Sequence, residues 1–249
     1  MTLWRLEWLR LVRTRRWLSL AGVLVFFGFV SPLSVRYAED LLTSLGPSEV
    51  QIILPEPTAF ESMRQFVGNV QQLGTLTVVL VSSAALALDG RPELAVFLRS
   101  RVRSARDLVL PRFAVNAAVA ALAFAGGGFA AWYETEVLLG SLPAGKTLAA
   151  IAMGCVFQVF VVATVAFAAG LGRSFLQTAI LAVGLLLSLP LLGLVGAIAP
   201  WLPSELSTFL ADLEQPRAFA DYGRPLAVTL ACIAAFLVLA VRRLETREL

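Results

Sequence analysis

The segment that comes nearest to a catalytic motif is Gly140–Thr147, which reads GSLPAGKT and matches the nucleotide-binding P-loop pattern at every defined position. In a P-loop, backbone N–H groups hold the phosphates, the lysine reaches the β- and γ-phosphates, and the hydroxyl residue binds Mg²⁺. This chemistry needs a strand before the loop and a sheet around it. Only about 15 residues separate the two apolar tracts here, too few for a nucleotide-binding fold. We therefore interpret the match as a coincidence and expect no ATPase site in this chain.

Other catalytic chemistry lacks its usual residues. The chain contains no histidine, which removes the commonest general acid/base and the commonest metal ligand. Both cysteines, Cys155 and Cys232, lie within apolar tracts, where they read as small hydrophobic residues. The same tracts hold no carboxylate, the buried group that intramembrane hydrolases and proton-coupled carriers usually employ. We expect this chain to be no enzyme and to hold no metal site.

The composition indicates a membrane protein. Hydrophobic residues make up 58% of the 249 residues and charged residues 15%, against about 25% charged in a typical soluble domain. Apolar tracts of about 17 to 25 residues can cross roughly 30 Å of hydrocarbon as helices, and one charge at a helix centre costs on the order of 3 kcal/mol. We predict an all-α polytopic membrane protein, a single domain over residues 1–249, with six charge-free transmembrane helices at about 17–33, 73–88, 113–131, 147–171, 175–199 and 225–241.

The basic residues predict the orientation. Fifteen of the 20 lie in the N-terminal segment, the second and fourth connections and the C-terminal tail, and five lie in the other connections. By the positive-inside rule, both termini are therefore cytoplasmic. Arginine outnumbers lysine by 19 to 1 and alanine is abundant, a composition that suggests a high-GC bacterium. The predicted location is the inner (cytoplasmic) membrane.

The N-terminal segment 1–16 mixes arginines with an apolar side formed by Trp4, Trp8, Leu11 and Val12. This pattern predicts a helix lying at the cytoplasmic interface before the first span; the alternative is a merely charged anchor. The first span lacks a clear small-residue cleavage site, so we interpret it as a retained anchor rather than a signal peptide.

A polar stripe marks the second span. Thr58 and Glu61 form a capping-box pattern after two prolines, so this helix is expected to start near Thr58 and to run to Leu88. At 100° per residue, one face of that helix carries Gln65, Asn69, Gln72 and Ser83. These side chains either line a solute route or bond to neighbouring helices and headgroups, and both interpretations remain open.

The fifth span contains Pro190, which is expected to kink it. The external segment 200–224 follows, and its start reads as a turn succeeded by a short helix over Leu206 to Leu210. We interpret this segment as re-entrant, dipping into the membrane from outside.

The cytoplasmic segment 89–112 begins with a turn and a proline at an early helical position. Leu94, Phe97, Leu98 and Val102 then recur at helical spacing, and arginines fill much of the rest. An amphipathic basic helix of this kind binds anionic lipid or docks on a partner protein. Charge alone would also allow nucleic acid, but nothing else supports it, and we expect none.

This segment resembles the corresponding stretch of ABC-2 type permeases, the membrane subunits of ATP-binding-cassette exporters. Ser104–Phe113 reads SARDLVLPRF, parallel to the family's S-R-R-D-L-V-L-A-K-F, and Asp89 stands at the family's opening acid. The departures are Val102 for the family's proline, Ala105 for its first arginine, and Glu93 and Leu94 for its Gly-Thr pair. The predicted layout of the whole chain is also similar, from the basic interfacial helix to the turn between the last two spans.

The resemblance implies that residues 90–107 are a coupling helix gripped by a separate cytoplasmic ABC ATPase. The coupling residues would be Arg91, Glu93, Phe97, Arg99, Arg101, Arg103, Arg106 and Asp107. Spans two and five would flank a translocation path between two permease copies, identical or related. The path residues would be Gln65, Asn69, Gln72, Ser83 and Pro190.

The function expected on these grounds is that of an ABC exporter permease. Its cargo would be apolar or amphipathic, such as a drug, peptide antibiotic or lipid, because the spans carry no fixed charge. Its partners would be two ATPase subunits, a second permease copy and membrane lipid, with ATP and Mg²⁺ on the ATPases and no cofactor in this chain. The alternatives are a non-transporting anchor or sensor subunit of a partner complex and a self-contained secondary carrier.

Overall fold

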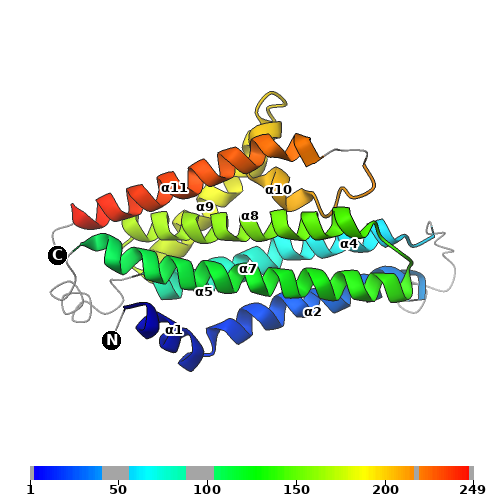
Figure 1. Ribbon diagram of the computed structural model, residues 1–249, viewed down its shortest axis with the longest axis horizontal. Helices are drawn as coiled ribbons and strands as arrows, with labels where there is room; N and C mark the ends of the chain where they lie inside the picture. Colours follow the sequence, from blue (N-terminus) through cyan, green and yellow to red (C-terminus); the bar gives the residue numbers. More distant parts are fainter. Residues whose placement is uncertain (1–2, 41–55, 88–103, 216–218, 247–249) are drawn as a thin grey trace, which may run out of the picture.

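The computed structural model of the protein describes residues 3–40, 56–87, 104–215 and 219–246. These residues form helices and turns without any strand, and six helices are long and apolar enough to cross a membrane. The predicted all-α fold with six spans is therefore confirmed. The start of α1 and the end of α11 lie at the same end of the bundle (Figure 1). We call this end the cytoplasmic end, as the distribution of arginines predicts, and the opposite one the outer end.

The six spans alternate in direction along the bundle (Figure 1). One span consists of two α-helices joined by a π-helical turn, Val70–Gly74, and short 3₁₀ turns lie at Ala199–Trp201 and Phe219–Tyr222. The α-helices are α1 (Leu3–Arg13), α2 (Arg16–Arg36), α4 (Ala59–Asn69), α5 (Thr75–Leu86), α7 (Ala105–Leu138), α8 (Ala144–Leu171), α9 (Phe175–Gly193), α10 (Ser204–Thr208) and α11 (Gly223–Glu245).

Local signals in the sequence account for two of the helix starts. The hydroxyl of Thr58 accepts a hydrogen bond from the backbone N–H of Glu61 at 3.2 Å, so the predicted cap of the second span is confirmed. Ser174 caps α9 in the same way through the N–H of Gln177. Each hydroxyl satisfies one of the N–H groups that have no partner in the first helical turn.

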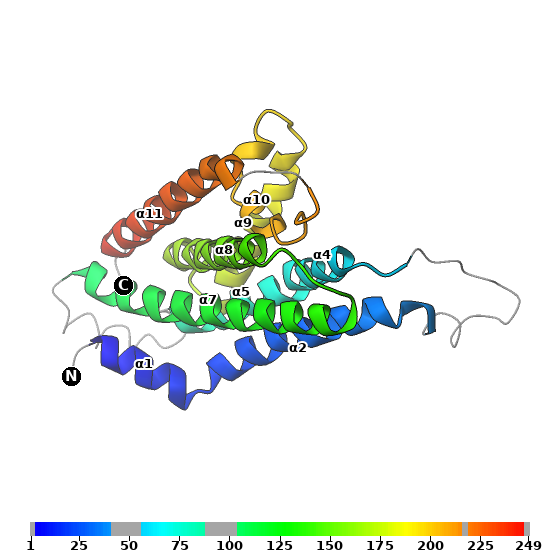
Figure 2. The same cartoon turned by 45° about the vertical axis from the view of Figure 1, so that its right-hand side comes forward.

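An elbow separates α1 from α2. Arg15 adopts a left-handed conformation with φ of 53°, and the two helices diverge from it as a V (Figure 2). On the predicted apolar side of α1, Leu11 is buried while Trp4, Trp8 and Val12 are exposed. These exposed apolar side chains suit a helix at the membrane interface.

The eight-residue P-loop match lies between two helices. It follows α7 and runs into α8, with Gly140 at φ of 117° in the connection. The hydroxyl of Thr147 donates to the carbonyl of Pro143 within α8. Since no strand precedes the loop, the structural context that a P-loop requires is missing here.

The fifth span is shorter than predicted, because α9 ends at Gly193 instead of residue 199. The chain then turns through residues 194–203 and forms α10 at Ser204–Thr208, two residues earlier than the predicted Leu206 to Leu210. Leu206, Phe209 and Leu210 are buried, and α10 packs against α8. The segment therefore packs onto the bundle, and its re-entrant character stays a prediction.

The centre of the bundle is α8, which contacts α5, α7, α9, α10 and α11. Of the 18 most apolar consecutive residues of α8, 61% are buried, compared with 22% in the corresponding stretches of α9 and α11. The outer faces of α9 and α11 are therefore available to lipid or to another protein.

Helix α2 crosses α7 closely at two glycines. A Cβ atom at Gly127 would lie 2.5 Å from the carbonyl oxygen of Leu24, and one at Gly28 would lie 2.5 Å from the carbonyl oxygen of Gly127. Both obstacles are backbone atoms, which cannot rotate away. The crossing therefore requires glycine at both positions, as small residues permit close helix approach in membranes.

This crossing predicts a sharp difference between two neighbouring glycines. We expect Gly127→Ala to force α2 away from α7 and to lower the free energy of unfolding by about 1–3 kcal/mol. Gly126→Ala is the matched control, because a Cβ there would meet only Val25 Cγ2 at 3.6 Å. The measurement is the thermal unfolding midpoint in detergent. Equal midpoints for the two variants would contradict the proposed role of the crossing.

Candidate functional site

A cavity of about 420 Å³ lies between the second span, α8, α9 and α10. Its walls are mostly aliphatic, with a few amide and hydroxyl groups and no charged residue. The polar or conformationally unusual lining residues are Gln71, Gln72, Thr75, Pro190, Ser204, Ser207 and Thr208.

The π turn presents two amides to this cavity. Thr75 donates both its N–H and its hydroxyl to the carbonyl of Val70, five residues earlier. A π turn inserts about one extra residue, so all later positions are rotated by roughly 100° compared with an unbroken α-helix. Such turns occur frequently at functional sites. Here the adjacent Gln71 and Gln72 both reach the same wall.

The opposite walls combine an irregular helix, α9, with the short helix α10. Pro190 of α9 has no N–H to donate to the carbonyl of Leu186, which also lines the cavity. On α10, the hydroxyl of Ser207 accepts a hydrogen bond from the Gln71 amide at 3.1 Å and donates to the carbonyl of Ser204. This contact fastens α10 to the second span.

The side-chain amide of Gln72 remains able to donate and accept hydrogen bonds. Its amide makes no hydrogen bond to the residues that the structure describes, whereas the neighbouring Gln71 is engaged by Ser207. An apolar cavity with a few convergent polar groups is the usual form of a small-molecule site. With no charge in its lining, this one suits an uncharged or amphipathic molecule.

The structure divides the predicted polar stripe. Gln72 and Pro190 lie in one cavity, but Gln65 is exposed outside it and Ser83 is buried. The π turn follows Gln65 and Asn69 and changes the helical register of the positions beyond it, so Ser83 does not stay on the face that an unbroken α-helix predicts. Asn69 donates to the hydroxyl of Ser31 on α2 at 2.9 Å. Of the two interpretations of the stripe, this bond fits the one in which the polar side chain bonds to a neighbouring helix.

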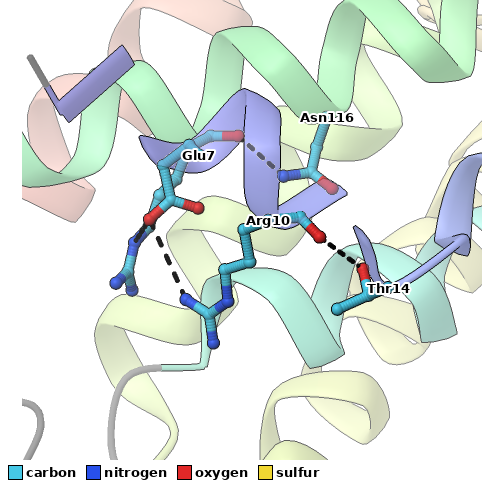
Figure 3. A network of polar contacts seen from close by, with 5 residues as sticks. Glu7, Arg10, Thr14 and Asn116 are labelled. Atoms are coloured by element: carbon cyan, nitrogen blue, oxygen red, sulfur yellow. Dashed lines mark hydrogen bonds and ion pairs between the residues drawn. The ribbon is translucent and has the colours of Figure 1, made fainter. Parts of the chain in front are cut away.

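A buried ion pair joins α1 to α7 at the cytoplasmic end (Figure 3). Arg112 is 4% exposed, and its Nε donates to Oε1 of Glu7, which is 7% exposed, at 2.9 Å. Arg10 lies 3.8 Å from the same oxygen, and the amide of Asn116 donates to the carbonyl of Arg112. The pair fixes α1 on the first third of α7.

The predicted coupling segment runs directly into α7. Arg91, Glu93, Phe97, Arg99, Arg101 and Arg103 lie outside the described residues. Arg106 and Asp107 are exposed in the first turn of α7, and this helix continues without interruption to Leu138, or about 51 Å at 1.5 Å per residue. Leu108 and Val109, just beyond them, pack with Val241 and Leu244 of α11.

Sequence reasoning missed Gln71, Ser207 and the Glu7–Arg112 pair. The Gln71-Gln72 doublet within an apolar region, together with Ser204, Ser207 and Thr208 at helical spacing, would have been a usable signal for the first two. No local pattern identifies the third, because its partners are 105 residues apart.

Comparison with known proteins gives a distant relative. No protein-family model matches the chain. The chain is 22% identical over 254 residues to the uncharacterized transmembrane protein YxlG of Bacillus subtilis (strain 168), an alignment that covers 100% of this chain and 98% of the other. This similarity and the six apolar helices make the chain a multi-pass membrane protein.

The ion pair predicts non-additive effects. We expect Glu7→Leu alone to lower the free energy of unfolding by about 3 kcal/mol, because it leaves the buried Arg112 without a partner. Arg112→Leu should cost less, because Glu7 keeps Arg10 at 3.8 Å. The double variant should regain most of the loss, since an apolar pair of similar size needs no partner. Thermal unfolding in detergent measures this. A double variant as unstable as the sum of the single variants would contradict it.

Proposed function

We propose that this chain is the membrane-spanning permease subunit of an ABC exporter of the ABC-2 type. The observation that carries the proposal is the cavity that holds both Gln72 and Pro190. These residues come from spans two and five, the two spans that the family resemblance makes the walls of a translocation path. The resemblance at Ser104–Phe113 and the 34-residue helix that contains it support the same function.

In the proposed assembly, two permease copies pair in the inner membrane and two cytoplasmic ABC ATPases bind beneath them. ATP and Mg²⁺ belong to the ATPases, and this chain contributes no catalytic residue. The weakly buried faces of α9 and α11 offer surfaces for a second copy. The cargo is apolar or amphipathic, because the cavity provides amides and hydroxyls without charge.

The proposed mechanism is mechanical. Closure of the ATPases moves the segment 90–107, and the continuous helix α7 carries this motion into the membrane. The Glu7–Arg112 pair makes α1 move with α7, and the contact of Leu108 and Val109 with α11 engages a third helix. The change at the cytoplasmic end thereby alters access to the cavity.

The first test is association with an ATPase. We expect the chain to co-purify in detergent with an ABC ATPase encoded beside it, and Arg103→Glu with Arg106→Glu to retain roughly tenfold less, because like charges across an interface repel. The matched control is Arg242→Glu with Arg243→Glu, two exposed arginines at the cytoplasmic end of α11. Failure of the unmodified chain to bind any such ATPase, or equal losses in both variants, would refute the proposal.

The second test addresses the cavity. Leu186→Trp places a large ring in the cavity, whereas Ile180→Trp places it on the exposed face of the same helix, where Ile180 is 62% exposed. In inverted vesicles that contain the assembled complex, we expect Leu186→Trp to reduce ATP-dependent uptake of the amphipathic dye rhodamine 6G to the level seen without ATP. Ile180→Trp should transport normally. Equal uptake by the two variants would place the cargo route elsewhere.

A further inference from the structure

A second cavity, also of about 420 Å³, forms a groove on the other side of the bundle between α1, α2 and α7. It exists because α1 is fixed to α7 by the Glu7–Arg112 pair and α2 is fixed to α7 by the glycine crossing. Between these two attachments the elbow stands away from α7, as the V of the two helices shows (Figure 2). The lining is almost entirely apolar and includes Trp8, Leu11, Trp17, Leu122, Ala123 and Gly126.

Three arginines surround the elbow beside this cavity. Val12 and Trp17 line the cavity, and their chain neighbours are Arg13 and Arg16, with Arg15 between them at the elbow itself. None of the three arginines has a carboxylate within ion-pair distance among the described residues. The nearby Glu7 is buried and engaged by Arg112 and Arg10.

The charged arginines and the apolar lining of the cavity lie at different depths in the membrane. The arginines precede the first apolar residue of α2, so they lie at headgroup level on the cytoplasmic side. Trp8 and Trp17 are about half exposed at the cavity and suit the same interfacial depth. Leu122 and Gly126 extend the cavity deeper along α7 toward the outer end.

We propose that this groove binds an anionic phospholipid of the cytoplasmic leaflet, with an acyl chain between α1, α2 and α7 and its phosphate on Arg13, Arg15 and Arg16. The apolar lining matches the chain, and the unpaired cations match the headgroup. A zwitterionic lipid would place a positive group among three arginines, so the site discriminates by charge. The bound lipid fills the space under the elbow and braces α1 against α7. The site is independent of the proposed transport function.

Tryptophan fluorescence tests the site directly. Replacing Trp4, Trp132 and Trp201 with Phe leaves Trp8 and Trp17 as the only indoles. Brominated phosphatidylglycerol, titrated into the detergent-solubilised protein, is expected to quench them at a several-fold lower mole fraction than brominated phosphatidylcholine. In this background, Arg13→Gln with Arg15→Gln and Arg16→Gln should abolish the preference, because these arginines supply the charge that distinguishes the two headgroups.

Two further variants separate the groove from general charge attraction. Arg173→Gln with Arg242→Gln and Arg243→Gln removes three exposed arginines at the same end of the bundle and should leave the preference intact. Gly126→Leu adds bulk at a residue that lines the groove, where a Cβ would meet only the side chain of Val25, and should weaken quenching by both lipids while all arginines remain.

Several results would overturn the proposal. Equal quenching by the two lipids would remove the charge discrimination, and equal losses in the two triple variants would leave only general attraction. Insensitivity of quenching to Gly126→Leu would place the lipid outside the groove. Quenching that appears only when dimers are dissociated would assign the groove to a second copy of the chain. Because no ATPase or cargo enters the measurement, failure of the transport proposal would leave it unaffected.

Discussion

The contact between α2 and α7 at Gly28 and Gly127 is the constraint on which the arrangement of the bundle depends. Within a bilayer, helices gain little by hiding apolar surface from lipid, so close packing and polar contacts must hold them together. Here two backbones touch because neither glycine has a side chain. On its other side α7 packs against α8, where the ring of Phe124 occupies the space that a Cβ at Gly154 would need. The absence of side chains at these glycines therefore lets α7 pack tightly against both α2 and α8.

Polar contacts then determine what moves with α7. Outside the glycine crossing, α7 bonds to α4 through Ser62 and Thr135 at 2.7 Å near the outer end, and to α1 through Glu7 and Arg112 at the cytoplasmic end. Both contacts are buried, where a polar group without a partner is costly. A displacement applied to the start of α7 therefore carries α1 with it, since separation would leave Arg112 unpaired.

The sequence predicts those features that depend on local chemistry or on the bilayer. Charge exclusion located all six spans because the cost of a buried charge acts on every residue of a span, and Thr58 identified a helix start because its bond reaches only three residues. The π turn, the Gln71–Ser207 bond across 136 residues and the Glu7–Arg112 pair across 105 residues arise from tertiary packing. Of the predicted path residues, Gln72 and Pro190 line the cavity and Ser83 does not, because a straight-helix calculation cannot include a register shift that packing imposes.

The two large cavities differ in a way that follows from how each is made. The cavity at Gln72 and Pro190 lies where two helices depart from regular geometry, so amides and hydroxyls are drawn into an uncharged space. The groove at Trp8 and Trp17 lies beside regular helices that are held apart by an elbow, and its polar groups are arginines outside the apolar lining. The cavity at Gln72 and Pro190 can bind an amphipathic molecule that carries no charge, whereas the groove at Trp8 and Trp17 favours a negatively charged headgroup at the membrane surface. On the proposed function, this separation lets structural lipid and cargo occupy one bundle without competing, because each site offers little to the occupant of the other.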